Sequence, residues 1–228
     1  MAECSKHFKT PSLRLAREWS PPDLPVLPDL WSDPIGQDPI PDEAACMAVW
    51  DRYAMLPHIG RHSRQVALMA AALAIRAEEI HAVKRPNELR AISYAAGLLH
   101  DIAKSYTVQY GGSHAQMGAA WVVDATRNRR IAQAVYYHVE WLWPLPDSLL
   151  HPVFFVIYAD KRAKHDQIVT LEERYDDLVV RYGKTAEARA GIERGREHVK
   201  TIERALSAQL EIPLHESSLV DGRLVVRT

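Results

Sequence analysis

Apolar residues recur at helical spacing along most of the chain after Pro41. His62, Val66, Met69 and Leu73, for example, follow at intervals of four, three and four residues, so they share one helix face. The same period predicts helices over about 42–55, 58–81, from 87 through 102, from 114, around 131–138, from 147 through 160, 171–182 and 185–210. We therefore expect an all-α helical bundle.

Capping residues indicate where three of these helices begin. Asp42 favours the start of the first helix, because a carboxylate is stabilised at the positive end of the helix dipole. Ser113, with Gln116 three residues later, has the pattern of a capping box and starts a helix at His114. Asp147 is the predicted cap of the helix that runs through residue 160.

The two ends of the chain depart from the helical pattern. Residues 21–41 hold seven of the 14 prolines, which excludes a helix or a central strand and predicts an extended arm. Asp221-Gly222 separates two short apolar runs within 219–226, which predicts a β-hairpin. We expect three parts, a proline-rich N-terminal extension, a helical domain and a C-terminal tail, over residues 1–43, 44–210 and 211–228.

The composition excludes several classes of protein. The formal net charge of −1 offers no basic surface for long nucleic acid or an anionic membrane. The longest apolar stretch, 66–75, is shorter than the roughly 20 residues that cross a bilayer, and the amino terminus has no signal-peptide pattern. Cys4 and Cys46 are too few for a disulfide framework. We expect a cytoplasmic protein, monomeric or homodimeric, that binds a small molecule and no membrane.

The strongest functional signal is His100-Asp101, which interrupts the apolar run 95–104. Burying both side chains without partners costs on the order of several kcal/mol, so we expect something to satisfy them. Four more polar residues end or begin apolar helix faces and are expected to point toward the same interior: His62, His114, His138 and Asp160. We predict that these six side chains form a metal site.

The ligand chemistry narrows the choice of metal. Imidazole and carboxylate together suit Fe, Mn, Ni, Co or Zn, and the lack of cysteine ligands argues against a closed structural zinc site. One ion is expected at four of the residues: His62, His100, Asp101 and Asp160. If Asp101 bridges, His114 and His138 suffice for a second ion, so we predict two. Taken singly, each histidine has the alternative of a hydrogen-bonded core residue, and Asp160 that of a cap or an ion pair.

Five short sequence features follow one another along the chain: His62, LLHDIAK at 98–104, His114, His138 and YADK at 158–161. This series, within residues 44–182, resembles the HD superfamily of metal-dependent phosphohydrolases. It is similar to the six-ligand branch that holds two metals, often iron, and includes bacterial hydrolases of diadenosine tetraphosphate. That branch usually has His-Thr or His-His at the fifth ligand, whereas this chain has His138-Val139. The substrate of that branch is therefore not assigned to this chain.

The resemblance implies hydrolysis of a phosphoester or phosphoanhydride in a small, nucleotide-like substrate by metal-activated water. Asp101 and Lys104 are the expected catalytic residues. Lys104, one helical turn from the ligand pair, is also expected to bind the substrate phosphate, together with Lys161 and Arg162. Trp141 is a candidate aromatic side chain for packing against a nucleotide base of the substrate. The alternatives are solvated cations and a tryptophan that packs on its own domain.

Two other functions remain open. Six-ligand HD relatives with mixed-valent iron oxidise a C–H bond with dioxygen, which an iron-only requirement and oxygen consumption would separate from hydrolysis. The chain could also be a sensing or binding module that has lost turnover. The presence of all six ligand residues favours an enzyme, since a module without turnover is free to lose at least one.

Overall fold

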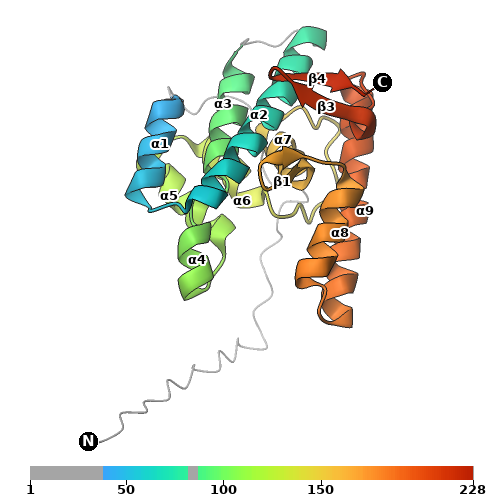
Figure 1. The fold of residues 1–228 in the computed structure, drawn as a ribbon. Helices are drawn as coiled ribbons and strands as arrows, with labels where there is room; N and C mark the ends of the chain where they lie inside the picture. Colours follow the sequence, from blue (N-terminus) through green and yellow to red (C-terminus); the bar gives the residue numbers. More distant parts are fainter. Residues whose placement is uncertain (1–37, 82–86, 228) are drawn as a thin grey trace, which may run out of the picture.

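The computed structural model of the chain describes residues 38–81 and 87–227. It is an all-α bundle, as predicted, and the strands within these residues form two short antiparallel hairpins (Figure 1). The proline-rich arm predicted over 21–41 lies almost entirely outside the described residues. No described helix combines the length and the apolar character needed to span a membrane.

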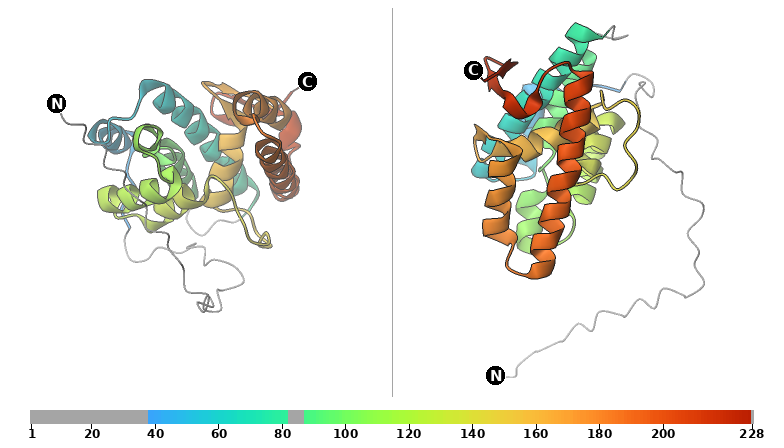
Figure 2. Two further views of the ribbon diagram at one scale, coloured as in Figure 1. Left: turned by 90° about the horizontal axis from the view of Figure 1, so that it is seen from below. Right: turned by 90° about the vertical axis from the view of Figure 1, so that its right-hand side faces the viewer.

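The elements of the structure agree closely with the helical periodicity of the sequence. In chain order they are α1 (Glu43–Arg52), α2 (Pro57–Ile80), α3 (Glu88–Leu99), α4 (Lys104–Tyr110), α5 (His114–Thr126), α6 (Arg129–Tyr137), α7 (Pro152–Arg162), β1 (Ala163–Lys164), β2 (Gln167–Ile168), α8 (Leu171–Tyr182), α9 (Ala186–Gln209), a 3₁₀ turn (Leu214–Glu216), β3 (Ser217–Val220) and β4 (Arg223–Val226). The two views of Figure 2 show α8 and α9 side by side at one flank of the bundle.

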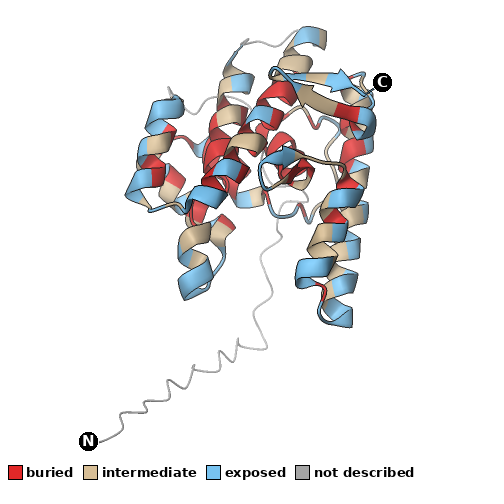
Figure 3. Cartoon of the chain, in the orientation of Figure 1, coloured by how far each residue is buried: buried red, intermediate tan, exposed pale blue. Residues whose placement is uncertain are grey.

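The centre of the bundle is formed by α2, α3 and α7, which pack against one another. Buried residues are concentrated on these three helices (Figure 3). Gly97 allows α2 and α3 to approach closely, because a Cβ atom at this position would lie 2.4 Å from the Cα of Ala67. This close approach brings His62 of α2 toward His100, which directly follows α3.

Local sequence explains where α1 and α5 begin. The first helix starts at Glu43, as predicted, and the Asp42 carboxylate caps it by accepting a hydrogen bond of 2.8 Å from the backbone N–H of Ala45. The Ser113 hydroxyl accepts from the backbone N–H of Gln116 at 3.3 Å, so the helix starts at His114 as expected.

Two predicted helix boundaries are wrong. The helix that carries Asp160 does not start at Asp147 but at Pro152, where the ring of the preceding His151 caps the backbone N–H of Val153. Proline favours the first helical position because its fixed φ suits the helix and it has no N–H to satisfy. The predicted helix from 87 through 102 ends at Leu99, and the four residues 100–103 form a turn before α4.

The predicted C-terminal hairpin is confirmed, with Ser217 opposite Val226 in the register of β3 and β4. Asp221 and Gly222 both have positive φ, 49° and 74°, which is the backbone of the tight turn that suits hairpin twist. The short hairpin of β1 and β2, directly after α7, had no clear signal in the sequence.

Candidate metal centre

The six predicted ligand side chains meet in the middle of the bundle although five segments of the chain supply them. His62 comes from α2, His114 is the first residue of α5, and Asp160 lies near the end of α7. His100 and His138 directly follow α3 and α6, and Asp101 follows His100. Two sets have ligand atoms within 4.8 Å of one another and could hold a metal ion: His62, His100 and Asp160, and His100, Asp101 and His138.

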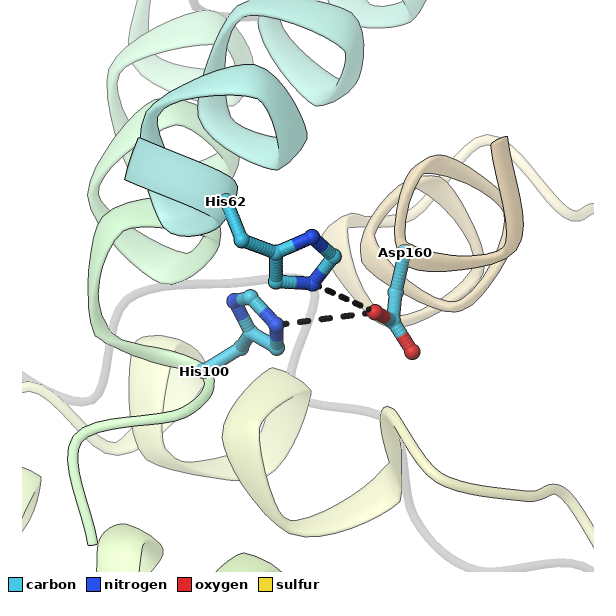
Figure 4. Close-up of side chains that lie close together, drawn as sticks. All are labelled: His62, His100 and Asp160. Carbon is cyan, nitrogen blue, oxygen red and sulfur yellow. Dashed lines mark hydrogen bonds and ion pairs between the residues drawn. The ribbon is translucent and has the colours of Figure 1, made fainter. Parts of the chain in front are cut away.

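The first set, which we call the deep group, consists of His62, His100 and Asp160. Asp160 Oδ1 lies 2.9 Å from His62 Nε2 and 3.7 Å from His100 Nε2. Figure 4 shows both imidazole rings directed at this carboxylate. Asp101 Oδ2 lies on the same side, 3.4 Å from His100 Nε2 and 4.0 Å from His62 Nε2. The deep group therefore combines two imidazoles with oxygens from two carboxylates.

The other two histidines, His114 and His138, form what we call the outer group. Their Nε2 atoms are 3.2 Å apart. They lie 3.4 Å and 3.6 Å from Asp101 Oδ1, the carboxylate oxygen that does not face the deep group. Asp101 thus lies between the two groups, with one oxygen toward each.

Backbone carbonyls fix the orientation of two of the imidazole rings. His100 Nδ1 lies 2.8 Å from the carbonyl oxygen of Gly97, and His138 Nδ1 lies 2.6 Å from that of Val135. A carbonyl only accepts, so each Nδ1 carries the proton and donates it. This arrangement directs Nε2 into the centre, as the second-nitrogen hydrogen bond of a metal-binding histidine does.

Two buried polar atoms in the centre have no hydrogen-bond partner among the described residues. They are His100 Nε2 and Asp101 Oδ1, and their residues are 0% and 1% exposed. Buried polar atoms are nearly always satisfied in folded proteins, because the loss of solvation is costly. A cation between the two groups would satisfy both atoms, so this donor set fits a metal ion.

The two carboxylates stay ionised although they are buried. Burial raises the pKa of Asp101, but the charges of His100 and Lys104 outweigh it and hold the pKa well below its usual value. Burial likewise raises the pKa of Asp160, and the charge of Lys161 opposes it most strongly, with the same net direction. The centre therefore carries buried negative charge that requires cations around it.

Of the four imidazoles, only that of His100 has a raised pKa, and burial lowers the pKa of His62, the other histidine of the deep group. Burial lowers the pKa of His114 to about 4 and also lowers that of His138. Burial acts in the same direction on His100, but the charge of Asp101 outweighs it and raises the pKa to about 9. The outer group is therefore neutral at pH 7, while the deep group holds a positive charge at His100.

Both predicted phosphate-binding lysines, Lys104 and Lys161, lie at the centre. Lys104 Nζ is 2.7 Å from Asp101 Oδ2, and its side chain is 39% exposed, so it extends from the buried carboxylate toward solvent. Lys161 donates to Asp160 Oδ2. Each lysine is paired with one of the carboxylates of the centre.

Arg162, predicted to bind substrate, lies elsewhere. Its side chain is fully buried, and it donates to the hydroxyl of Tyr158 and to three carbonyls, those of Val169, Leu214 and Ser217. These contacts join α7 to the C-terminal tail and leave the guanidinium no access to a substrate. The structure thus argues against the predicted contact, because Lys161 and Arg162 point to different sides of α7.

Trp141 also packs within the domain. The residue is 2% exposed, and its ring contacts Tyr137, Trp143 and Phe154 at centroid distances of 5.2, 5.4 and 5.1 Å. The indole N–H donates to the carbonyl of Pro144. Because its faces are covered, the structure argues against the predicted stacking on a base and favours the alternative of a packed core tryptophan.

One partly buried cation of α8 was not among the residues singled out from the sequence. Arg174 lies on the buried side of α8, between Leu171 and Tyr175, which are 1% and 3% exposed. The signal was available, because an arginine at this spacing interrupts the apolar face of a predicted helix.

The chain was compared with known proteins in three ways. The family model described as HD domain matches residues 59–177, slightly more than half of the chain. All six predicted ligands lie within the matched residues. No curated protein and no solved structure matches the chain.

Proposed function

We propose that this chain, which belongs to the HD domain family, is a metal-dependent phosphohydrolase with a two-metal centre. Its substrate is a small, nucleotide-like molecule, in which it cleaves a phosphoester or phosphoanhydride bond. The position of Asp101 carries the proposal, because its two oxygens face two separate sets of imidazoles. A carboxylate shared in this way is suited to bridge two ions.

The described residues divide between the two ions. The deep group, with Asp101 Oδ2, would hold one ion, and the outer group, with Asp101 Oδ1, would hold the other. Metal ions at such a centre supply Lewis acidity, which lowers the pKa of water to about 7 and neutralises charge on a phosphate oxygen. Imidazole and carboxylate ligands suit Fe, Mn, Co, Ni or Zn.

The chain's own cations hold the substrate. Lys104 lies beside the shared carboxylate and reaches toward solvent, so its ammonium can bind a phosphate oxygen while it stays near Asp101. Lys161, on the other side of the deep group, neutralises Asp160 and contributes a second positive charge. Together they offset the charge of the carboxylates and make the approach of an anionic substrate favourable.

The test combines metal analysis with anaerobic hydrolysis. The purified full-length protein should contain about two transition metal ions per chain. Without dioxygen, and with manganese or cobalt, it should cleave at least one class among phosphomonoesters, diesters and dinucleoside polyphosphates. Asp101→Ala should abolish both metal binding and turnover, because it removes the ligand common to both groups.

A matched control separates loss of the ligand from loss of any aspartate. Asp124→Ala removes an exposed carboxylate that pairs with Arg52 on the surface, and it should change neither property. Two bound ions without turnover on the whole panel would refute the hydrolase. Consumption of dioxygen with an iron-only requirement would assign the centre to oxidation instead.

A further inference from the structure

Four aromatic rings follow one another across α4, α5 and the end of α1, and we call them the aromatic surface. Their centroids lie 4.6, 5.8 and 4.2 Å apart in the order Tyr110, Tyr106, Trp121 and Tyr53. Tyr106 and Tyr110 are 42% and 65% exposed, and no residue of α4 is buried. Figure 1 shows α4 projecting from the bundle, so these rings are open to a binding partner.

The aromatic surface lies in an uncharged part of the chain. No Asp, Glu, Lys or Arg occurs between Lys104 and Asp124, a stretch that covers the rest of α4 and most of α5. The exposed helices α8 and α9, by contrast, contain many charged residues. Exposed apolar surface without charge is a common mark of an interaction site.

The polar ends of the four rings are available as donors. Tyr94 and Tyr158, elsewhere in the domain, donate to the carboxylates of Glu43 and Glu203. Within the described residues, no hydrogen bond involves the hydroxyls of the three tyrosines of the aromatic surface or the indole N–H of Trp121. Aromatic rings with donors at their edges suit a polyproline II segment, because the carbonyls of such a segment make no internal hydrogen bonds.

The chain itself contains a segment with this chemistry. Residues 22–30, which lie outside the described residues, read PDLPVLPDL, three triplets that each begin with proline and end with leucine. A polyproline II helix has about three residues per turn, so the prolines would share one face and the leucines a second. The third face would hold the two aspartates and can stay in water. An uncharged proline face matches the uncharged aromatic surface.

The described chain begins within reach of the aromatic surface. The carbonyl of Pro39 accepts a hydrogen bond of 3.1 Å from the side chain of Asn128, the cap of α6. Trp121 precedes Asn128 by seven residues, roughly 10 Å along a helix. The chain from residue 30 to residue 38 can extend over roughly 26 Å. At about 3.1 Å per residue, two of the triplets are long enough to cover the four rings.

We propose that residues 22–30 bind to the aromatic surface of the same chain as a polyproline II helix, with the proline face on the rings. The tyrosine hydroxyls and the indole N–H of Trp121 donate to carbonyls of the segment. Because the segment is tethered, its effective concentration at the surface is on the order of millimolar, so even a weak contact is occupied most of the time. The inference is independent of the proposed function, since it involves no candidate metal ligand.

The experiment measures cross-linking within the full-length chain. Cys4→Ser removes one native thiol, and the other, Cys46, is fully buried, which raises the pKa of its thiol to about 12 and keeps it unreactive. In this background Val26→Cys places a thiol between the prolines, and Gln109→Cys places one on the exposed side of α4, next to Tyr110. A short bismaleimide should join these two thiols within one chain.

Val180→Cys in place of Gln109→Cys is the matched control. Val180 is 84% exposed on α8, at another flank of the bundle (Figure 1). The pair with Gln109→Cys should cross-link roughly 10-fold faster, because binding raises the local concentration above that of a free tether. Replacing both Pro25 and Pro28 with glycine should abolish this preference, because glycine does not restrict the backbone to polyproline II.

A second measurement needs no added cysteine. The indole N–H signal of Trp121, assigned through Trp121→Phe, should shift in the proton–nitrogen NMR spectrum when Pro25 and Pro28 are both replaced with glycine. The indole N–H of Trp141, which is 2% exposed and donates to the carbonyl of Pro144, should keep its position.

Three results would overturn the inference. The first is an equal cross-linking rate for Gln109→Cys and Val180→Cys, or a preference that the glycine substitutions leave unchanged. The second is a cross-link that forms only between chains, when chains with Val26→Cys are mixed with chains with Gln109→Cys, which would assign the surface to a second copy. The third is an unmoved Trp121 signal, which would show that the segment does not touch the rings.

Discussion

The deep and outer groups lie on opposite oxygens of Asp101, but they differ in charge and in burial. The deep group has a second carboxylate, that of Asp160, and it is enclosed by α2, α3 and α7. The outer group has two imidazoles and no carboxylate of its own, and the His114 side chain is 27% exposed. His100 has a pKa of about 9, whereas that of His114 is about 4.

This difference in charge and burial predicts which of the two ions binds more tightly. Two carboxylates in a buried environment attract a cation more strongly than one shared oxygen does. We therefore expect the deep ion to bind tightly and the outer ion to bind more weakly. The exposed side of His114 is also the side on which a substrate can approach, since the deep group is covered by helices.

The largest expected effect comes from removing one ligand of each group in turn. His100→Ala should leave less than one ion per chain and lower kcat/KM more than about 100-fold, because even an indirect partner of a ligand contributes roughly 10- to 100-fold. His114→Ala should retain about one ion, because the deep group stays complete. Metal analysis by mass spectrometry after dialysis measures both.

His58→Ala controls for the loss of a histidine. His58 lies one turn before His62 on α2 and is exposed, so both ions and the activity should remain. Equal metal loss in His100→Ala and His114→Ala would contradict the difference between the groups.

A substitution of Gly97 should affect the deep group indirectly, by changing how α2 and α3 pack. In Gly97→Ala the new methyl group would meet the backbone of Ala67, so α2 and α3 must move apart and His62 must leave His100. We expect a loss of about 2–3 kcal/mol of unfolding free energy, as overpacking causes, and a weaker deep ion. Denaturation with and without chelator measures both effects.

Gly191→Ala is the matched change in α9, where the nearest atom, at 3.9 Å, is the flexible end of Arg194. It should stabilise the protein by about 0.5–1 kcal/mol, because alanine is the better helix former. An unchanged stability of Gly97→Ala would show that α2 and α3 do not depend on this close approach.

The smallest expected effect is a difference in proton release. Below pH 9 His100 carries a proton in the metal-free protein, and a metal ion can bind only after that proton leaves. The affinity of the deep group should therefore rise about tenfold per pH unit from pH 7 toward 9. His114, with a pKa of about 4, is already neutral in this range and releases none.

Calorimetry at pH 7.5 in two buffers of different ionisation enthalpy measures the protons released. His114→Ala, which keeps the deep group, should release about one proton per ion. Release of no proton by this variant would show that His100 is neutral and that Asp101 does not hold it charged.

Much of the centre could be predicted from the sequence because its signals are local. A histidine or aspartate that ends an apolar helix face, as His62 and Asp160 do, is directed inward whatever the rest of the fold is. The caps at Asp42 and Ser113 likewise depend only on neighbouring residues. The wrong cap at Asp147 has the same origin, because aspartate caps helices more often than histidine does, so the local sequence favours Asp147 over His151.

The amino-acid order by itself determined the helical elements, the six metal-binding candidates and the likeness to the HD family, since each of these depends on residue type and spacing. Only the tertiary structure decided which oxygen of Asp101 faces which histidines, and which cations reach the centre. Lys161 and Arg162 are adjacent and equally charged, but one pairs with Asp160 and the other holds the C-terminal tail. His62 meets Asp160 only because α2 packs on α7, and contacts between distant segments leave no trace in local spacing.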